Sequence, residues 1–155
     1  MRGRIRFSAT LLLCVGAMVA GVATGKEKAK SAADCFTPAF NAGNADAVAA
    51  CYADNAILWL PGGPMAQGRT AIRDGFAGFF AKSRIKDITI SPIGHERMGN
   101  SMASWGTFVV RMVDKATGAE TTEHGRYTDV SRKIGGRWLY VVDHPSDDPP
   151  AAVAK

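Results

Sequence analysis

Residues 102–144 read MASWGTFVVRMVDKATGAETTEHGRYTDVSRKIGGRWLYVVDH, and this stretch decides the fold. It holds three segments rich in β-branched and aromatic residues: 102–114, 120–133 and 137–144. Glycine-containing turn sequences separate the segments, KATG at 115–118 and IGG at 134–136, as is typical of hairpins. The stretch therefore predicts three consecutive long antiparallel strands.

The residues before this stretch predict helices and two more strands. Helices are expected over 31–42, 45–53 and 70–82, and strands over 56–60 and 87–93. Pro38 is expected to kink or restart the first helix, and Asn44 to cap the second. Ile72, Phe76 and Phe80 recur at the spacing of a helix that packs on a sheet. Helices followed by long strands imply an α+β domain in which a curved sheet wraps around the helices.

Short motifs in both halves of the chain carry a resemblance to a known family. Those in the helical half read FNAGNAD at 40–46, CYADNA at 51–56 and GRTAIR at 68–73. They resemble the nuclear transport factor 2-like superfamily, which includes ketosteroid isomerases and SnoaL-like cyclases. The C-terminal GRW and DHPSD motifs, at 136–138 and 143–147, look closest to a bacterial subgroup of largely unassigned function.

The resemblance spans residues 34–150 and implies a cone-shaped α+β domain. In this nuclear transport factor 2-like fold, three N-terminal helices pack on a curved, mostly antiparallel sheet, with a pocket between the two layers. The family's chains are often homodimers. Because the fold hosts enzymes, ligand-binding modules and association domains alike, it does not by itself fix an activity.

The resemblance also implies which isomerase residues this chain keeps. The family's general base stands immediately before the strand-ending proline, where this chain has Leu60, which cannot accept a proton. The family's tyrosine stands on the first helix, where Phe36 keeps the ring and lacks the hydroxyl. Asp129 falls where the family has a protonated carboxylic acid. We therefore expect no ketosteroid isomerase activity.

Asp129 is the starting point for a candidate pocket. If it points inward, strand alternation places Tyr127 and Glu123 on the same face, so Asp129 and Tyr127 are the candidate catalytic residues. A buried Asp with a raised pKa could act as a hydrogen-bond donor or as a general acid. In the alternative, Asp129 and Tyr127 satisfy each other, or a backbone group, within a filled core.

Apolar side chains are expected to form the walls of this pocket. They are Phe36, Leu58, Leu60, Phe76, Phe80, Phe108, Val110 and Met112. Asp143 is expected near the rim, either as a turn-capping residue or as a polar contact at the pocket mouth. Such a pocket suits a small hydrophobic ligand with one or two polar groups.

Three functions follow as alternatives. The first is an exported module that binds a small apolar ligand without chemistry. The second is a SnoaL-like acid-base enzyme, of isomerase, cyclase or hydrolase type, that uses Asp129. The third is a dimeric association domain with a filled pocket. Trp105 and Val109, on the outer face of the sheet, are the expected surface of a homodimer.

The N-terminal residues predict export. Arg2, Arg4 and Arg6 precede an uncharged run over residues 7–25 that ends in small residues, which is the layout of a secretory signal peptide. A permanent membrane anchor is the alternative, but the run falls short of the roughly 20 strongly apolar residues that a span needs. The expected organisation is a signal peptide over 1–25, a leader over 26–33, the domain over 34–147 and a loose tail over 148–155. The mature protein would be periplasmic or secreted, without membrane association.

The formal net charge of +5, from 19 Lys and Arg against 14 Asp and Glu, comes mostly from this signal. Residues 1–25 hold three Arg and no acid, so the rest of the chain has a net charge of +2. Its basic residues are interspersed with acids and form no block of like charge. We therefore expect no nucleic-acid partner.

Cys35 and Cys51 remain after Cys14 leaves with the signal, and export would place them in an oxidising compartment. Each lies eight residues from Gly43, so a helical hairpin that turns at Gly43 brings them together and predicts a disulfide. Two buried free thiols are the alternative. The three histidines show no metal-binding spacing, and we expect neither a metal nor a cofactor.

Overall fold

The computed structural model describes residues 30–148 of the chain. The predicted signal peptide, the first half of the predicted leader and all but the first residue of the predicted tail lie outside the described residues. In chain order the elements are α1 (Ala33–Asn41), α2 (Ala45–Ala49), β1 (Tyr52–Trp59), β2 (Met65–Gln67), α3 (Arg69–Lys82), β3 (Ser83–Met98), β4 (Ser101–Asp114), β5 (Glu120–Ile134) and β6 (Arg137–Asp147). This is the predicted α+β arrangement.

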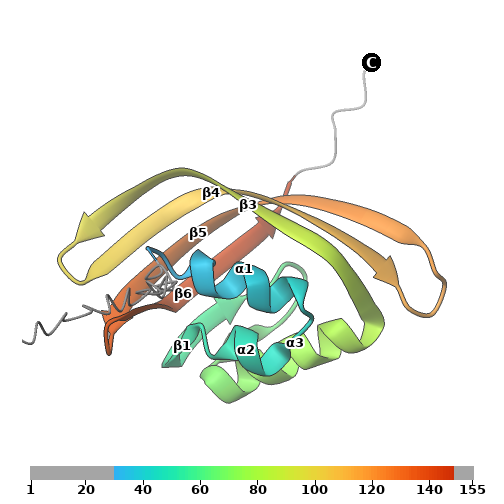
Figure 1. Ribbon diagram of the computed structural model, residues 1–155, viewed down its shortest axis with the longest axis horizontal. Helices are drawn as coiled ribbons and strands as arrows, with labels where there is room; N and C mark the ends of the chain where they lie inside the picture. The colour runs from blue at the N-terminus through green and yellow to red at the C-terminus, as the bar shows by residue number, and fades with distance from the viewer. Residues whose placement is uncertain (1–29, 149–155) are drawn as a thin grey trace, which may run out of the picture.

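Six strands form one open sheet in the order β2-β1-β6-β5-β4-β3. β1 and β6 run parallel, and the other neighbouring pairs run antiparallel. Figure 1 shows the long strands β3 to β6 arching over the helices, which lie on the concave side of the sheet. The predicted hairpin turns are confirmed, since Gly118 and Gly135 adopt positive φ angles of 74° and 56°.

The edge strand β3 is longer than predicted. It runs from Ser83 to Met98, whereas the sequence pattern predicted residues 87–93. Pro92 and Gly94 interrupt the pattern of a strand, because a proline cannot donate a hydrogen bond to the ladder. β3 is an edge strand that pairs with β4 alone among the described strands, so the missing hydrogen-bond donor of the proline is tolerated. The register between β3 and β4 shifts between Pro92 and Gly94.

The second helix is shorter than predicted. α2 ends at Ala49 and β1 already begins at Tyr52, whereas the pattern predicted helix as far as residue 53. Tyr52 is fully buried and pairs with Tyr140 of β6, so packing within the sheet outweighs the helical pattern. The short strand β2, after the turn that follows β1, has no counterpart in the prediction.

α1 and α2 form the predicted helical hairpin. Gly43 turns the chain with a φ angle of 61°, and the Asn44 side chain caps α2 by accepting a 2.9 Å hydrogen bond from the Ala47 N–H. The predicted disulfide between Cys35 and Cys51 is confirmed, and it joins Cα atoms 5.7 Å apart. Closing a loop of this length contributes about 3 kcal/mol to stability.

α1 continues through Pro38, so the restart, one of the two predicted outcomes, does not occur. Phe36 and Phe40, on either side of the proline, are buried with their ring centroids 5.4 Å apart. Burial of this helix face outweighs the hydrogen bond that a proline cannot donate. α3 buries Ile72, Phe76 and Phe80, as its spacing predicted. The core therefore lies between these two helices and the concave face of the sheet.

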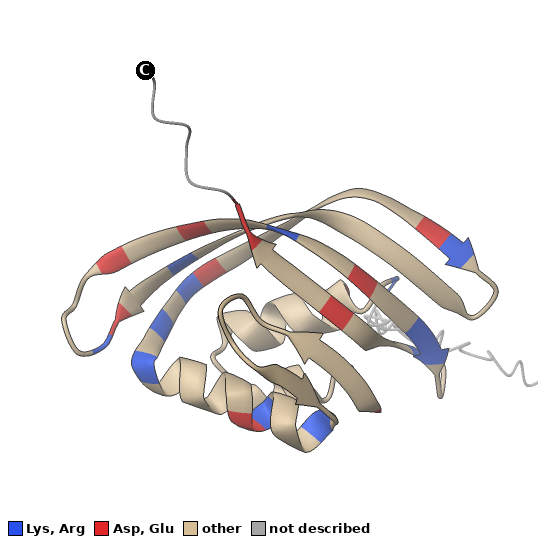
Figure 2. Cartoon of the chain, turned by 180° about the vertical axis from the view of Figure 1, so that it is seen from behind, with Lys and Arg blue, Asp and Glu red and all other residues tan. Residues whose placement is uncertain are grey.

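Charged residues are distributed over the outside of this core. Figure 2 shows acidic and basic segments interspersed over the strands and α3. Some are paired between neighbouring strands, as Arg111 is with Asp87 at 2.6 Å, and such exposed pairs contribute little to stability. None of the helices within residues 30–148 has the length and hydropathy that crossing a membrane requires.

Candidate functional site

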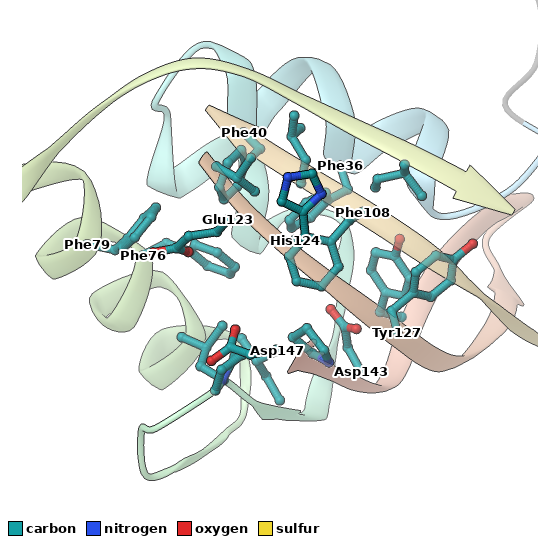
Figure 3. Close-up of a pocket in the computed structure, with 18 residues that line it drawn as sticks. Phe36, Phe40, Phe76, Phe79, Phe108, Glu123, His124, Tyr127, Asp143 and Asp147 are labelled. Atoms are coloured by element: carbon teal, nitrogen blue, oxygen red, sulfur yellow. The ribbon is translucent and has the colours of Figure 1, made fainter. Parts of the chain in front are cut away.

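A cavity of about 480 Å³ lies between the helices and the concave face of the sheet. Its volume is within the range of small-molecule sites, roughly 300–1,000 Å³. The lining residues are Phe36, Phe40, Leu58, Leu60, Pro61, Phe76, Phe79, Ile88, Ile90, Phe108, Val110, Glu123, His124, Tyr127, Tyr140, Asp143, Pro145 and Asp147. Figure 3 shows these side chains arranged around the open space.

Aromatic rings make up much of the wall. The Phe36 ring packs edge to face against Phe76 and Tyr140, at centroid distances of 5.9 and 6.0 Å. Across the sheet, the Phe108 ring lies over Gly125 of the neighbouring strand, where a Cβ atom would overlap it. The glycine therefore makes the room that lets Phe108 lie against the sheet.

The polar wall comes from the neighbouring strands β5 and β6. Their register pairs Asp129 with Asp143 and Gly125 with Asp147. Glu123 lies two residues from Gly125 and so faces the same side, because alternate residues of a strand share a face. Four carboxyl groups thus share the concave face of two strands, and three of them, those of Glu123, Asp143 and Asp147, line the cavity.

Asp143 is the carboxyl group of the inner wall. It is half-buried, and its Oδ2 accepts a 2.6 Å hydrogen bond from the hydroxyl of Tyr52, which is fully buried beneath it. Burial raises the pKa of Asp143 to about 6, although the Tyr52 hydrogen bond and the nearby His144 act in the opposite direction. Asp143 therefore gains or loses its proton near neutral pH.

Asp129 is the strand partner of Asp143 but does not line the cavity. It is 4% exposed, and burial together with the negative charge of Asp143 raises its pKa to about 8, opposed by a hydrogen bond from the Ser104 side chain. Near pH 7, Asp129 thus keeps its proton while Asp143 is largely ionised. Two neighbouring carboxyl groups whose pKa values differ in this way divide the roles of proton donor and proton acceptor.

Glu123 and Asp147 form the rim of the cavity, and both are exposed. Partial burial and the charge of Asp147 raise the pKa of Glu123. Within the described residues, neither carboxylate forms an ion pair with a Lys, Arg or His side chain. The described residues therefore give these two rim carboxylates no ion-pair partner.

The cavity includes most of the sequence-predicted pocket. The predicted residues that line it are Phe36, Leu58, Leu60, Phe76, Phe108, Val110, Tyr127 and Asp143. Phe80 and Met112 do not line it: they are buried in the core, where Phe80 packs against Phe40 with ring centroids 5.3 Å apart. Asp129 is inward-facing but covered. Leu60 and Phe36, which stand at the isomerase positions, contribute apolar surface only.

Several residues of the site were not predicted. Phe40 and Phe79 lie on the cavity side of their helices, and Ile88 and Ile90 alternate along β3, so the helical and strand periods could have indicated them. Tyr52 could not be found in this way, because its motif was assigned to a helix. Among residues 30–148, no cluster of three or more His, Cys, Asp or Glu side chains is arranged to hold a metal ion.

Solved structures share this fold. A ketosteroid isomerase-like protein from Erwinia carotovora atroseptica SCRI1043 is 24% identical, over 77% of this chain and 92% of that chain, with a TM-score of 0.69. A nuclear transport factor 2-like superfamily protein from Salmonella enterica subsp. enterica serovar Typhimurium str. LT2 is 15% identical, over 80% and 91% of the two chains, with a TM-score of 0.67. At these identities the similarity shows the fold alone.

A third solved structure is that of a Xanthomonas campestris protein provisionally assigned as a calcium/calmodulin dependent protein kinase II association domain. It is 26% identical, over 76% of this chain and 84% of that chain, with a TM-score of 0.62. Comparison with curated proteins found no match. The family model of the SnoaL-like domain matches residues 32–141, which cover the helices and most of the sheet. The chain therefore belongs to the SnoaL-like domain family of the nuclear transport factor 2-like superfamily.

Proposed function

We propose that the domain binds a small, largely apolar molecule in the cavity between its helices and its sheet. The observation that carries this proposal is the open cavity of about 480 Å³, walled by aromatic and aliphatic side chains. A few polar groups, chiefly Asp143 and Tyr127, lie among them. An apolar enclosure with a small number of placed polar groups is the usual form of a ligand site. The open volume disfavours an association domain with a filled pocket.

A matched pair of variants on β3 tests this proposal. Ile90 lines the cavity, whereas Ile93 on the same strand is 72% exposed. Ile90→Trp should fill the cavity and abolish binding of the neutral fluorescent dye N-phenylnaphthylamine. Ile93→Trp adds the same side chain outside the cavity and should leave dye binding unchanged. Equal dye binding by both variants would show that the cavity is not the binding site.

An acid-base enzyme is the second candidate function. The observation that favours it is Asp143, which lines the cavity, accepts the hydroxyl hydrogen bond of Tyr52 and has a pKa of about 6. A carboxylate with that pKa suits the role of general base near neutral pH. Asp129, which the sequence suggested for this chemistry, would then hold the neighbouring proton. Asp143→Asn should remove any turnover while leaving dye binding intact.

We also propose that the protein is exported and acts as a homodimer. Export is supported by the signal-like N-terminus and by the disulfide between Cys35 and Cys51. A dimer is supported by exposed apolar side chains on the outer face of the sheet, where Trp59 is 39% and Trp105 is 41% exposed. Native mass spectrometry of protein purified from the periplasm would report signal cleavage, subunit number and any bound molecule together.

A further inference from the structure

We propose that the ligand of the cavity carries a positive charge, as an amphipathic amine or a quaternary ammonium compound does. This inference rests on the proposed binding function and names the class of molecule bound. It follows from the chemistry of the lining, in which carboxylates and aromatic rings occur together.

The ionisable side chains of the lining are mostly acids, and His124 of β5 is the one basic residue among the described residues that line the cavity. Glu123, Asp143 and Asp147 supply three carboxyl groups, and no Lys or Arg is among the described residues that line the cavity. Arg126, a basic residue of β5 outside the lining, is paired with Asp148 at 2.9 Å. Among the described residues, no Lys or Arg of the lining therefore balances the negative charge of these carboxyl groups.

Asp143 shows this lack of a counter-charge most clearly. Among the described side chains, the neutral Tyr52 hydroxyl donates a hydrogen bond to it, and Asp129 and Tyr140, which also lie close to it, are acids. His144 follows it in the chain but belongs to the opposite face, where its ring packs on Trp59 with centroids 5.7 Å apart. Buried charges are normally paired, so a cation brought by the ligand would complete this site.

The aromatic wall suits the same kind of ligand. A cation over the face of an aromatic ring is stabilised by about 0.5–2 kcal/mol, the larger value applying when water is excluded. Figure 3 shows Asp143 beside Tyr127 at one end of the cavity and Phe76 and Phe79 at the other. We place the ammonium group between Asp143 and Tyr127, with the apolar part of the ligand toward the two phenylalanines. An anionic ligand, such as a fatty acid, would instead meet like charge at the rim and at the wall.

Three probes of similar size and different charge test this proposal. They are benzyltrimethylammonium, its uncharged carbon isostere neopentylbenzene, and the anion phenylbutyrate. Measured by calorimetry at about pH 7.5, where Asp143 is ionised, the cation should bind at least about tenfold more tightly than the isostere, and the anion weakest of all. A cation that binds no better than its isostere, or does not bind, overturns the proposal. Dye binding by the wild type reports separately on the proposed function.

Variants that replace one carboxylate by its amide test whether Asp143 causes the preference for the cation over its uncharged isostere. Asp143→Asn should bring the cation and the isostere to within about twofold of each other without weakening the isostere. Asp74→Asn removes the same charge from the outer surface of α3, where the side chain is 62% exposed, and should leave the preference intact. If Asp143→Asn does not fold, the exposed pair Glu123→Gln and Asp147→Asn should lower the preference by about threefold. An unchanged preference in these cavity variants overturns the proposal.

Discussion

The hydroxyl of Tyr52 donates a 2.6 Å hydrogen bond to the carboxylate of Asp143 across 91 residues of chain. The bond joins the first strand of the sheet to the last and lies directly under the cavity. It holds one oxygen of Asp143, a residue that also lines the cavity. The Tyr52 hydroxyl therefore influences both the position and the ionisation of a carboxyl group that lines the cavity.

Removing this hydrogen bond should raise the pKa of Asp143 further. Tyr52→Phe deletes the donor that favours the ionised carboxylate, so we expect a pKa above the wild-type value of about 6 and a loss of about 1–3 kcal/mol in stability. Carbon-detected NMR titration of Asp143 measures the shift. Tyr140→Phe, which removes a phenol that does not donate to Asp143, is the matched control. The same pKa in wild type and Tyr52→Phe would contradict this account.

Asp129 should make stability fall as pH rises. Its pKa is about 8 in the folded protein, so between about pH 4 and about pH 8 the folded state holds a proton that the unfolded state has lost. The free energy of unfolding should then decrease by up to about 1.4 kcal/mol per pH unit in that window. The titratable groups that face Asp129 are Asp143, Tyr52, Tyr127 and Tyr140.

Asp129→Asn tests that assignment, because the amide resembles the protonated acid and cannot ionise. In urea denaturation at several pH values, the variant should lose stability only over the lower part of the window, where Asp143 still titrates. Parallel curves for wild type and variant would show that Asp129 is ionised in the folded protein.

Gly125→Ala should damage the cavity wall. The added Cβ would overlap the Phe108 ring and the carbonyl of Ser146, so we expect a loss of about 1–3 kcal/mol and weaker dye binding. Gly78→Ala is the control, since a Cβ there has no neighbour within 4 Å and the helix α3 should gain about 0.5–1 kcal/mol. In thermal unfolding, Gly125→Ala should melt at a lower temperature than the wild type, and Gly78→Ala at a higher one.

Reduction of the disulfide should loosen the helical hairpin. Opening the bond between Cys35 and Cys51 returns freedom to the unfolded chain, and we expect the free energy of unfolding to fall by about 3 kcal/mol. Urea denaturation with and without reductant gives the value. The double variant Cys35→Ala and Cys51→Ala should match the reduced protein and should not respond to reductant.

The strand pattern and the turns could be predicted because each depends on local sequence. The alternation of Phe108 and Val110 placed both on the cavity wall, and glycines marked the hairpins. Tyr52 was missed because its strand is fixed by pairing with Tyr140, far along the chain. Asp129 and Asp143 are register partners on one face, so alternation alone could not tell which of them reaches the cavity.

The parallel pairing of β1 with β6 has a consequence for the order of folding. β1 lies near the beginning of the domain, yet it pairs with the final strand, β6. In this pairing Leu58 of β1 is the partner of Asp143 of β6. A chain with such distant partners cannot close its hydrophobic core while it is still emerging from the ribosome. Contacts so far apart in sequence also slow folding. The sheet is thus completed beside β1 only once the C-terminal strand is available, so the first and the last strand of the domain depend on each other.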